Sequence, residues 1–151
     1  MVCPFCLHKK TGVYNSRTAR NGTVVWRRRR CLACKGTFTT EESFNPTSLW
    51  KIEKGDGVTP YSRSRLAHSI IKACDHRKNI EDRVLYLAQT VENNLLPKAV
   101  QKKLTLSASD ILTMTAKVLK TFDATAYIKY LSYHNPQMDT PTLRKQLKAN
   151  S

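Results

Sequence analysis

Two Cys-x-x-Cys pairs close to the N-terminus constrain this chain more than any other feature of its sequence. Cys3 and Cys6 form the first pair, Cys31 and Cys34 form the second, and 24 residues separate Cys6 from Cys31. Four thiolates at such spacing satisfy the tetrahedral coordination of Zn2+ and leave no position open for water. The pattern therefore predicts a zinc ribbon that holds one structural Zn2+ per chain, with no catalytic role for the metal.

Redox chemistry and disulfide formation are the alternative uses of paired cysteines. A redox motif needs only one pair and usually lies in a βαβ unit, whereas disulfides are rare where thiols stay reduced. No segment has the roughly 18 consecutive apolar residues of a membrane span, and the N-terminus lacks the features of a secretory signal. We therefore expect a cytoplasmic chain that does not associate with a membrane, and an inert thiol at the isolated Cys74.

The charge of the chain is strongly positive. Lys and Arg number 26 against 11 Asp and Glu, which gives a formal net charge of +15. Residues 1–48 carry nine of the basic side chains and only two acids, so charge is densest in the N-terminal third. Such a field attracts polyanions before any specific contact forms. On charge alone, nucleic acid and an anionic membrane surface are the leading partners, and of these two we expect nucleic acid.

Four consecutive arginines, at positions 27–30, lead directly into Cys31. Alternate residues of a β-strand face opposite ways, so two pairs of guanidinium groups should lie on the two faces of the ribbon. Phosphate groups of a duplex are suitable partners for such an array. A solvated surface or a protein contact is the alternative, although ordinary surfaces mix both signs of charge. The residues expected to contact nucleic acid are Arg17, Arg27, Arg28, Arg29, Arg30, Thr39 and Thr40.

Two aromatic residues accompany this basic segment. Trp26 and Tyr14 could stack on bases, but aromatic side chains in a small ribbon more often cover the metal core. We therefore expect both rings to be buried against the zinc site. These residues do not separate DNA from RNA as the partner.

The composition changes near residues 43–46, where helical periodicity begins. We place a zinc ribbon at 1–46, a second domain at 47–136 and a polar, basic tail at 137–151. Asn21-Gly22 predicts a hairpin between the two cysteine pairs, and a second hairpin is expected where segments 49–52 and 58–61 flank a glycine-rich turn. Four amphipathic helices follow, giving an α+β chain. Their expected N-terminal caps are Ser62, Asn79, Ser107 with Asp110 as a capping box, and Asp123.

The chain resembles the bacterial NrdR family, the nucleotide-responsive repressors of ribonucleotide reductase genes, over about residues 1 to 134. The resemblance rests on many short ordered matches, including Cys3-Pro4-Phe5-Cys6, Asn15-Ser16-Arg17, Phe38-Thr39-Thr40, Pro60-Tyr61 and Ala126-Tyr127. It implies a zinc ribbon followed by an ATP-cone, which is a β-hairpin lid on a four-helix bundle that binds ATP or dATP. By position, the nucleotide contacts would be Ile52, Lys54, Arg65 and Tyr127, and the operator contacts would be Arg17 and Arg27 to Arg29.

The chain departs from the family pattern at several of these places. Trp26 stands where the family usually has the first arginine of its run, and Thr59 stands where a glutamate is common. The residues after the predicted fourth helix also differ from the family's usual ending, which bears on contacts between protomers. The resemblance therefore identifies the chain as a divergent member.

The function expected from these features is transcriptional repression in the bacterial nucleoid. The repressor would bind double-stranded promoter DNA of ribonucleotide reductase genes, and ATP or dATP would control its homo-oligomeric state, whether dimer, tetramer or larger. The sequence has no Gly-x4-Gly-Lys-Ser/Thr loop, so the nucleotide would be sensed and not hydrolysed. An enzyme is not expected, because no nucleophile stands beside a candidate base. The alternative is a zinc-ribbon RNA-binding module with a helical protein-interaction domain.

Overall fold

The structure, a computed structural model, describes residues 1–20, 22–55 and 57–134. It divides into two compact units, Met1–Asn45 and Pro46–Ser151. Asn21 of the first predicted turn and the predicted tail at 137–151 lie outside the described residues.

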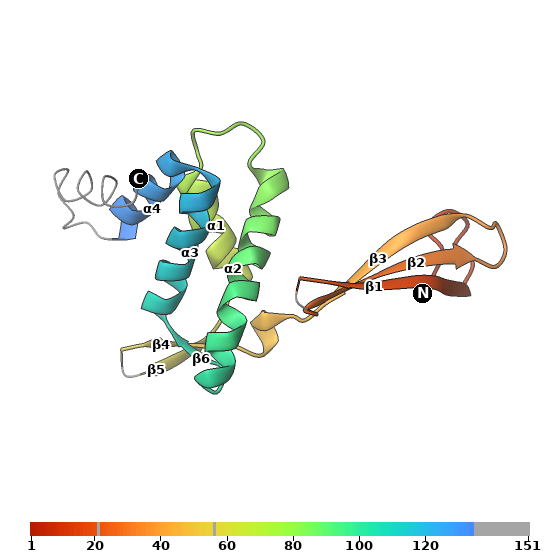
Figure 1. Cartoon of the computed structure of the whole chain (residues 1–151), viewed down its shortest axis with the longest axis horizontal. Helices are drawn as coiled ribbons and strands as arrows, with labels where there is room; N and C mark the ends of the chain where they lie inside the picture. The colour runs from red at the N-terminus through yellow and green to blue at the C-terminus, as the bar shows by residue number, and fades with distance from the viewer. Residues whose placement is uncertain (21, 56, 135–151) are drawn as a thin grey trace. The chain divides into compact units, whose positions relative to one another are not determined.

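The first unit is a three-stranded antiparallel sheet in the order β1-β2-β3 (Figure 1). Its strands are β1 (Thr11–Ala19), β2 (Val24–Cys31) and β3 (Thr37–Ser43). The predicted hairpin joins β1 to β2, and β3 follows the second cysteine pair to cover the other edge of β2. A bulge between Val13 and Asn15 leaves Tyr14 without a partner across the sheet. The arginine run thus lies on the central strand.

This unit has little apolar core of its own. Among the described residues of the unit, its buried hydrophobic side chains are Cys3, Val24 and Cys31. Two of these three are predicted metal ligands, so burial of apolar surface can supply only a small part of the folding free energy. Metal binding, worth on the order of 10 kcal/mol in small zinc peptides, supplies the stabilisation that the core lacks.

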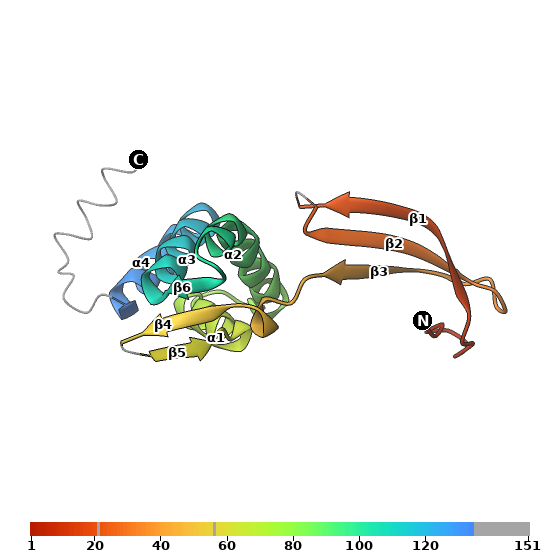
Figure 2. The ribbon, with the colours of Figure 1, turned by 90° about the horizontal axis from the view of Figure 1, so that it is seen from below.

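The second unit combines a small sheet with four helices (Figure 2). The 3-10 turn η1 (Pro46–Ser48) leads into the hairpin of β4 (Lys51–Lys54) and β5 (Gly57–Pro60). A short strand, β6 (Thr105–Ser107), pairs in parallel with β4, so β4 lies in the centre of the order β5-β4-β6. This sheet lies across one end of the helices. The predicted second hairpin is present, whereas β6 was not expected.

The four helices are α1 (Arg63–Ala73), α2 (Glu81–Gln101), α3 (Ala108–Phe122) and α4 (Ala124–His134). Their apolar stripes meet in a common core, and the predicted α+β class is confirmed. Among the fully buried side chains of this core are Ile70, Val91, Leu95, Leu106 and Leu119. Among the described residues, no helix combines the length and the apolar character that crossing a membrane requires.

Three of the four predicted helix caps are confirmed. The Ser62 hydroxyl accepts a hydrogen bond from the Arg65 N–H, and Ser107 forms the expected capping box at the start of α3. The Asp123 carboxylate accepts from the Ala126 N–H at 2.9 Å. The fourth prediction was wrong: Asn79 has a φ of +56°, and Ile80 caps α2 with no side-chain hydrogen bond. Asn79 instead takes the left-handed conformation that asparagine tolerates better than most residues.

Candidate functional sites

The four predicted zinc ligands come together in the first unit. One sulfur atom from each of Cys3, Cys6, Cys31 and Cys34 lies within 4.8 Å of the others. The Sγ atoms of Cys3 and Cys34 are 3.7 Å apart, and those of Cys6 and Cys31 are 3.6 Å apart. A tetrahedron with Zn–S bonds of about 2.3 Å has sulfur atoms about 3.8 Å apart. The cluster therefore fits Zn2+ and offers it four protein ligands.

The local backbone explains why the sulfur atoms converge. Each cysteine pair is followed by a left-handed residue, Leu7 with a φ of 58° and Lys35 with a φ of 60°. This conformation turns the chain back toward the metal position, and the Phe5 N–H donates to the Cys3 sulfur at 3.4 Å. Burial raises the pKa of Cys31, but the backbone N–H groups of Cys34 and Ala33 lower it more, and the resulting pKa is about 6. Such N–H donors favour the thiolate form that binds metal.

One face of the ribbon uses its arginines to hold the sheet together. Arg27 forms an ion pair with Glu42 across β2 and β3, with a nitrogen-to-oxygen distance of 2.8 Å. Arg29 donates a hydrogen bond of 3.3 Å to the hydroxyl of Thr40. Both arginine side chains are half-buried. Their contacts within the sheet already use part of their hydrogen-bonding capacity.

The opposite face presents exposed arginines. Arg28 and Arg30 are exposed on this side of β2, and Arg17 lies on β1 directly across from Trp26. The Arg28 Nε donates a hydrogen bond of 3.1 Å to the hydroxyl of Tyr14. A surface depression of about 410 Å3 runs along this face, and its lining residues are Tyr14, Asn15, Arg17, Trp26, Arg28 and Thr39.

The prediction that Trp26 and Tyr14 cover the metal core was wrong. Trp26 is 48% exposed and Tyr14 is 60% exposed. Strand alternation gives the reason, because Trp26 is five residues before Cys31 on β2 and so faces the other side of the sheet. The rings of Phe5 and Phe38, with centroids 6.3 Å apart, make an edge contact near the cysteines instead.

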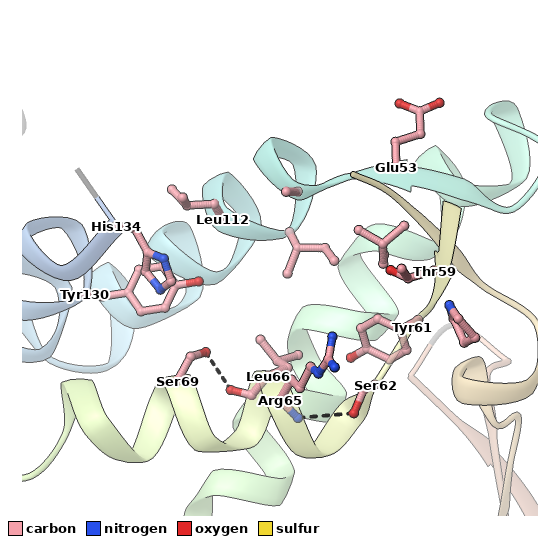
Figure 3. Close-up of a pocket in the computed structure, with 14 residues that line it drawn as sticks. Glu53, Thr59, Tyr61, Ser62, Arg65, Leu66, Ser69, Leu112, Tyr130 and His134 are labelled. Carbon is pink, nitrogen blue, oxygen red and sulfur yellow. Dashed lines mark hydrogen bonds between the residues drawn. The ribbon is translucent and has the colours of Figure 1, made fainter. Parts of the chain in front are cut away.

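The second unit contains a cavity of about 340 Å3 between the hairpin, α1, α3 and α4 (Figure 3). Its wall is mainly apolar, with Leu66, Ile111 and Leu112 among its lining residues. Arg65 reaches into the cavity from the first turn of α1, close to the cap residue Ser62. Tyr130 and His134 lie at the α4 end, where burial raises the pKa of Tyr130 and lowers that of His134.

The structure describes the side chains of three predicted nucleotide contacts, Ile52, Arg65 and Tyr127, and two of these three line this cavity. Ile52 and Arg65 are among its lining residues. Lys54 ends strand β4 beside the turn of the hairpin, and its backbone pairs with that of Gly57. Tyr127 does not line the cavity, whereas Tyr130, one helical turn further along α4, does. Tyr130 was not among the contacts predicted from the sequence, although the i, i+3 spacing of the two tyrosines places them near one face of α4.

The isolated cysteine is part of the core of the second unit. Cys74 follows the last residue of α1 and is fully buried. Burial raises the pKa of its thiol, so little of the reactive thiolate forms at neutral pH.

Comparison with known proteins gives consistent matches. A family model described as "Transcriptional repressor NrdR-like, N-terminal domain" matches residues 1–42. A protein of Petrotoga mobilis named "Transcriptional repressor NrdR" is 30% identical over 148 residues, which are 98% of this chain and 97% of that protein. Proteins of the same name from Corynebacterium kroppenstedtii and Thermobifida fusca are 35% and 36% identical, each over 89% of this chain and over 85% and 84% of their own lengths.

Proposed function

This chain belongs to the NrdR family of transcriptional repressors, and on that premise we propose that it represses ribonucleotide reductase genes in response to adenine nucleotides. Residues 1–46 would bind promoter DNA through the zinc ribbon, and residues 47–136 would bind ATP or dATP. The observation that carries the proposal is that the two units offer different binding sites. The first presents exposed arginines beside a four-sulfur metal site, and the second contains an open cavity of ligand size.

The cavity of the second unit has features that suit a nucleotide. Its volume lies within the range of roughly 300 to 1,000 Å3 that is usual for small-molecule sites. Its apolar wall can cover an adenine ring, and the α1 N-terminus offers backbone N–H groups and the Arg65 guanidinium to phosphates. Lys54 on the adjoining hairpin would add a second cation. Without a phosphate-binding Gly-x4-Gly-Lys-Ser/Thr loop, the nucleotide would act as a signal and not as a substrate.

Regulation would act through the homo-oligomeric state. A ligand shifts an equilibrium between assemblies only if it binds one of them more tightly than the other. Protomers in the DNA-binding assembly would place their ribbons at half-sites separated according to the helical repeat. We therefore expect the nucleotide to change both the oligomer mass and the affinity for the promoter, with the protein acting on the bacterial nucleoid.

One experiment tests this function directly. The zinc-loaded full chain is measured without nucleotide, with ATP and with dATP, and both its mass and its affinity for a reductase promoter duplex are recorded. At least one nucleotide should change both quantities. The Arg65→Ala variant should lose most of this response, whereas Arg83→Ala, which removes an exposed arginine of α2 outside the cavity, should keep it. The same mass and affinity in all three conditions would contradict a nucleotide-sensing role.

The RNA-binding alternative receives no support from the relatives, which are named as transcriptional repressors. A filter-binding comparison of promoter duplex with a structured RNA of equal length separates the two. Tighter binding of the duplex at the same salt concentration is expected, because both polymers offer phosphates and only the promoter offers a matching groove.

A further inference from the structure

The arginines on the two faces of the ribbon differ in their contacts and in their exposure to solvent. On one face Arg27 is paired with Glu42, and Arg29 is half-buried against Thr40. On the other face Arg17, Arg28 and Arg30 are exposed. Using the first face for phosphates would mean breaking contacts that already hold β2 to β3. On the second face Arg28 also forms hydrogen bonds between strands, but its side chain and those of Arg17 and Arg30 are exposed and can be reached by a ligand.

The strand register places the exposed side chains in ordered rows. Trp26 lies between Arg17 of β1 and Glu41 of β3, and Arg28 lies between Asn15 and Thr39. Directly opposite residues share a face of a sheet and are close enough to act together. These rows contain three exposed arginines and only one carboxylate, that of Glu41. The positive charge therefore concentrates toward Arg28 and Arg30, next to the metal site.

Arg28 is held in position before any ligand binds. Its Nε donates to the Tyr14 hydroxyl at 3.1 Å, and one terminal nitrogen donates to the Thr37 hydroxyl at 3.4 Å. A guanidinium group has five N–H donors, so donors remain for a further acceptor. Holding the group in one orientation lowers the entropy lost when it binds a phosphate or a base edge.

Trp26 adds a different chemistry to the same face. Its indole is 48% exposed and borders the depression together with Arg17 and Arg28. An indole cannot neutralise a phosphate, so it adds nothing to the salt-dependent attraction. It can make apolar contact with a thymine methyl group or donate one hydrogen bond to a base edge, and both depend on sequence.

We propose that the Trp26 face, defined as Tyr14, Arg17, Trp26, Arg28, Arg30 and Thr39, docks on duplex DNA and that Trp26 is a specificity-determining residue there. The inference rests on the proposed function, since it assigns the surface through which that function acts. It divides the residues expected from the sequence into two groups. Arg17, Arg28, Arg30 and Thr39 face the DNA, whereas Arg27, Arg29 and Thr40 hold the sheet together.

The first test compares two arginines that are neighbours in sequence and lie on opposite faces. Binding of a random-sequence duplex is measured over a series of salt concentrations for the wild type, Arg28→Gln and Arg29→Gln, each with confirmed zinc content. Arg28→Gln should reduce the slope of log affinity against log salt by about one, because one phosphate contact is lost. Arg29→Gln should keep the wild-type slope. A lower slope for Arg29→Gln with an unchanged slope for Arg28→Gln would overturn the face assignment.

The second test uses the emission of the two tryptophans. Trp50 is 1% exposed, so acrylamide quenching of the free protein reports mainly on Trp26. The duplex used is one that the wild-type chain selects from a randomised pool. At saturation it should protect the Trp26 emission from acrylamide. The Trp26→Phe variant should show no such quenchable emission. Trp26→Ala should also reduce the preference for the selected over the random duplex by about tenfold.

The outcomes separate the two levels of the proposal. Bound duplex with unprotected Trp26 emission would overturn the inference and leave the repressor function standing. Failure of the zinc-loaded wild type to bind any duplex would remove the proposed function and the inference together. Protection with an unchanged preference in Trp26→Ala would overturn the specificity role alone.

Discussion

The hydroxyl group of Tyr61 donates a hydrogen bond of 2.9 Å to the carboxylate of Glu92, which is 1% exposed. Arg63 completes the cluster, because its Nε and one terminal nitrogen lie 2.8 and 2.6 Å from the two carboxylate oxygens. Burial, followed by the charge of Glu92, raises the pKa of Tyr61, so the phenol remains a donor. The cluster ties the chain after the hairpin to the middle of α2, and Tyr61 also lines the cavity.

Removal of this buried carboxylate should destabilise the second unit. Glu92→Ala leaves Tyr61 and Arg63 without their acceptor, and breaking a buried pair from one side costs roughly 3 kcal/mol. The low end of the usual range applies because the Arg63 side chain is 35% exposed and can turn to water. Urea unfolding, followed by Trp50 emission in a Trp26→Phe background, measures the loss. Glu81→Ala, at an exposed site of α2, is the control, and an equal loss there would contradict the assigned role.

Asp123 should make the second unit sensitive to acid. Burial raises the pKa of Asp123, but the Ala126 N–H and the side chains of Arg77 and His76 lower it more. The pKa therefore falls from 3.8 to about 2. The folded pKa lies below the unfolded one, so the stabilisation is present above about pH 4 and is lost as the pH falls toward 2. Its size is at most roughly 2 kcal/mol.

The test for Asp123 is the slope of unfolding free energy against pH. Asp123→Asn retains an oxygen for the cap and removes the charge, so its slope between pH 4 and pH 2 should be shallower than that of the wild type. Asp82→Asn, at an exposed position of α2, should reproduce the wild-type slope. Parallel curves for wild type and Asp123→Asn would show that the carboxylate makes no such contribution.

Gly36 leaves space that the zinc site needs. A Cβ atom at this position would lie 2.6 Å from the ring of Phe5 and 3.3 Å from the sulfur of Cys34. The exposed Phe5 ring can move aside, but the sulfur atom is fixed by its predicted metal bond. Gly36→Ala should therefore lower zinc affinity by about tenfold, measured by competition with a chromophoric chelator. Gly12→Ala should leave it unchanged, since nothing lies within 4 Å of that Cβ, and equal affinities for both variants would contradict the prediction.

Lys54→Ala should separate DNA binding from its regulation. The residue belongs to the second unit, so promoter affinity without nucleotide should match the wild type. The response to ATP and dATP should disappear, because a cation for the phosphates is lost. Parallel promoter titrations with and without nucleotide provide the measurement. Lys51→Ala, on the same strand but outside the cavity lining, is the control. A full nucleotide response in Lys54→Ala would place the phosphates elsewhere.

Features that depend on neighbouring residues could be predicted from the sequence. The cysteine pairs, the caps at Ser62 and Ser107 and the alternation of the arginine run each follow from a spacing of two to four residues. Asn79 failed as a cap because asparagine also favours left-handed turns, and the sequence does not distinguish the two uses.

Features that depend on distant contacts could not be predicted. Strand β6 has three residues and exists through its parallel pairing with β4, more than 50 residues earlier. Glu92 would look like an ordinary polar residue of α2, because its partners Tyr61 and Arg63 are about 30 residues away. Whether an arginine of β2 is paired or exposed likewise depends on β3, because the pairing of the two strands brings Glu42 and Thr40 close to β2.

The alternation along β2 also restricts how this chain can evolve. Substitutions can change one side chain and leave its neighbours in place, but inserting or deleting a single residue before Cys31 would exchange the two surfaces of the strand. Arg27 and Arg29 would then point outward, while Trp26 and Arg28 would be forced against Glu42 and Thr40. Homologues should therefore tolerate a change of residue type here more readily than a change in the number of residues between the turn and Cys31.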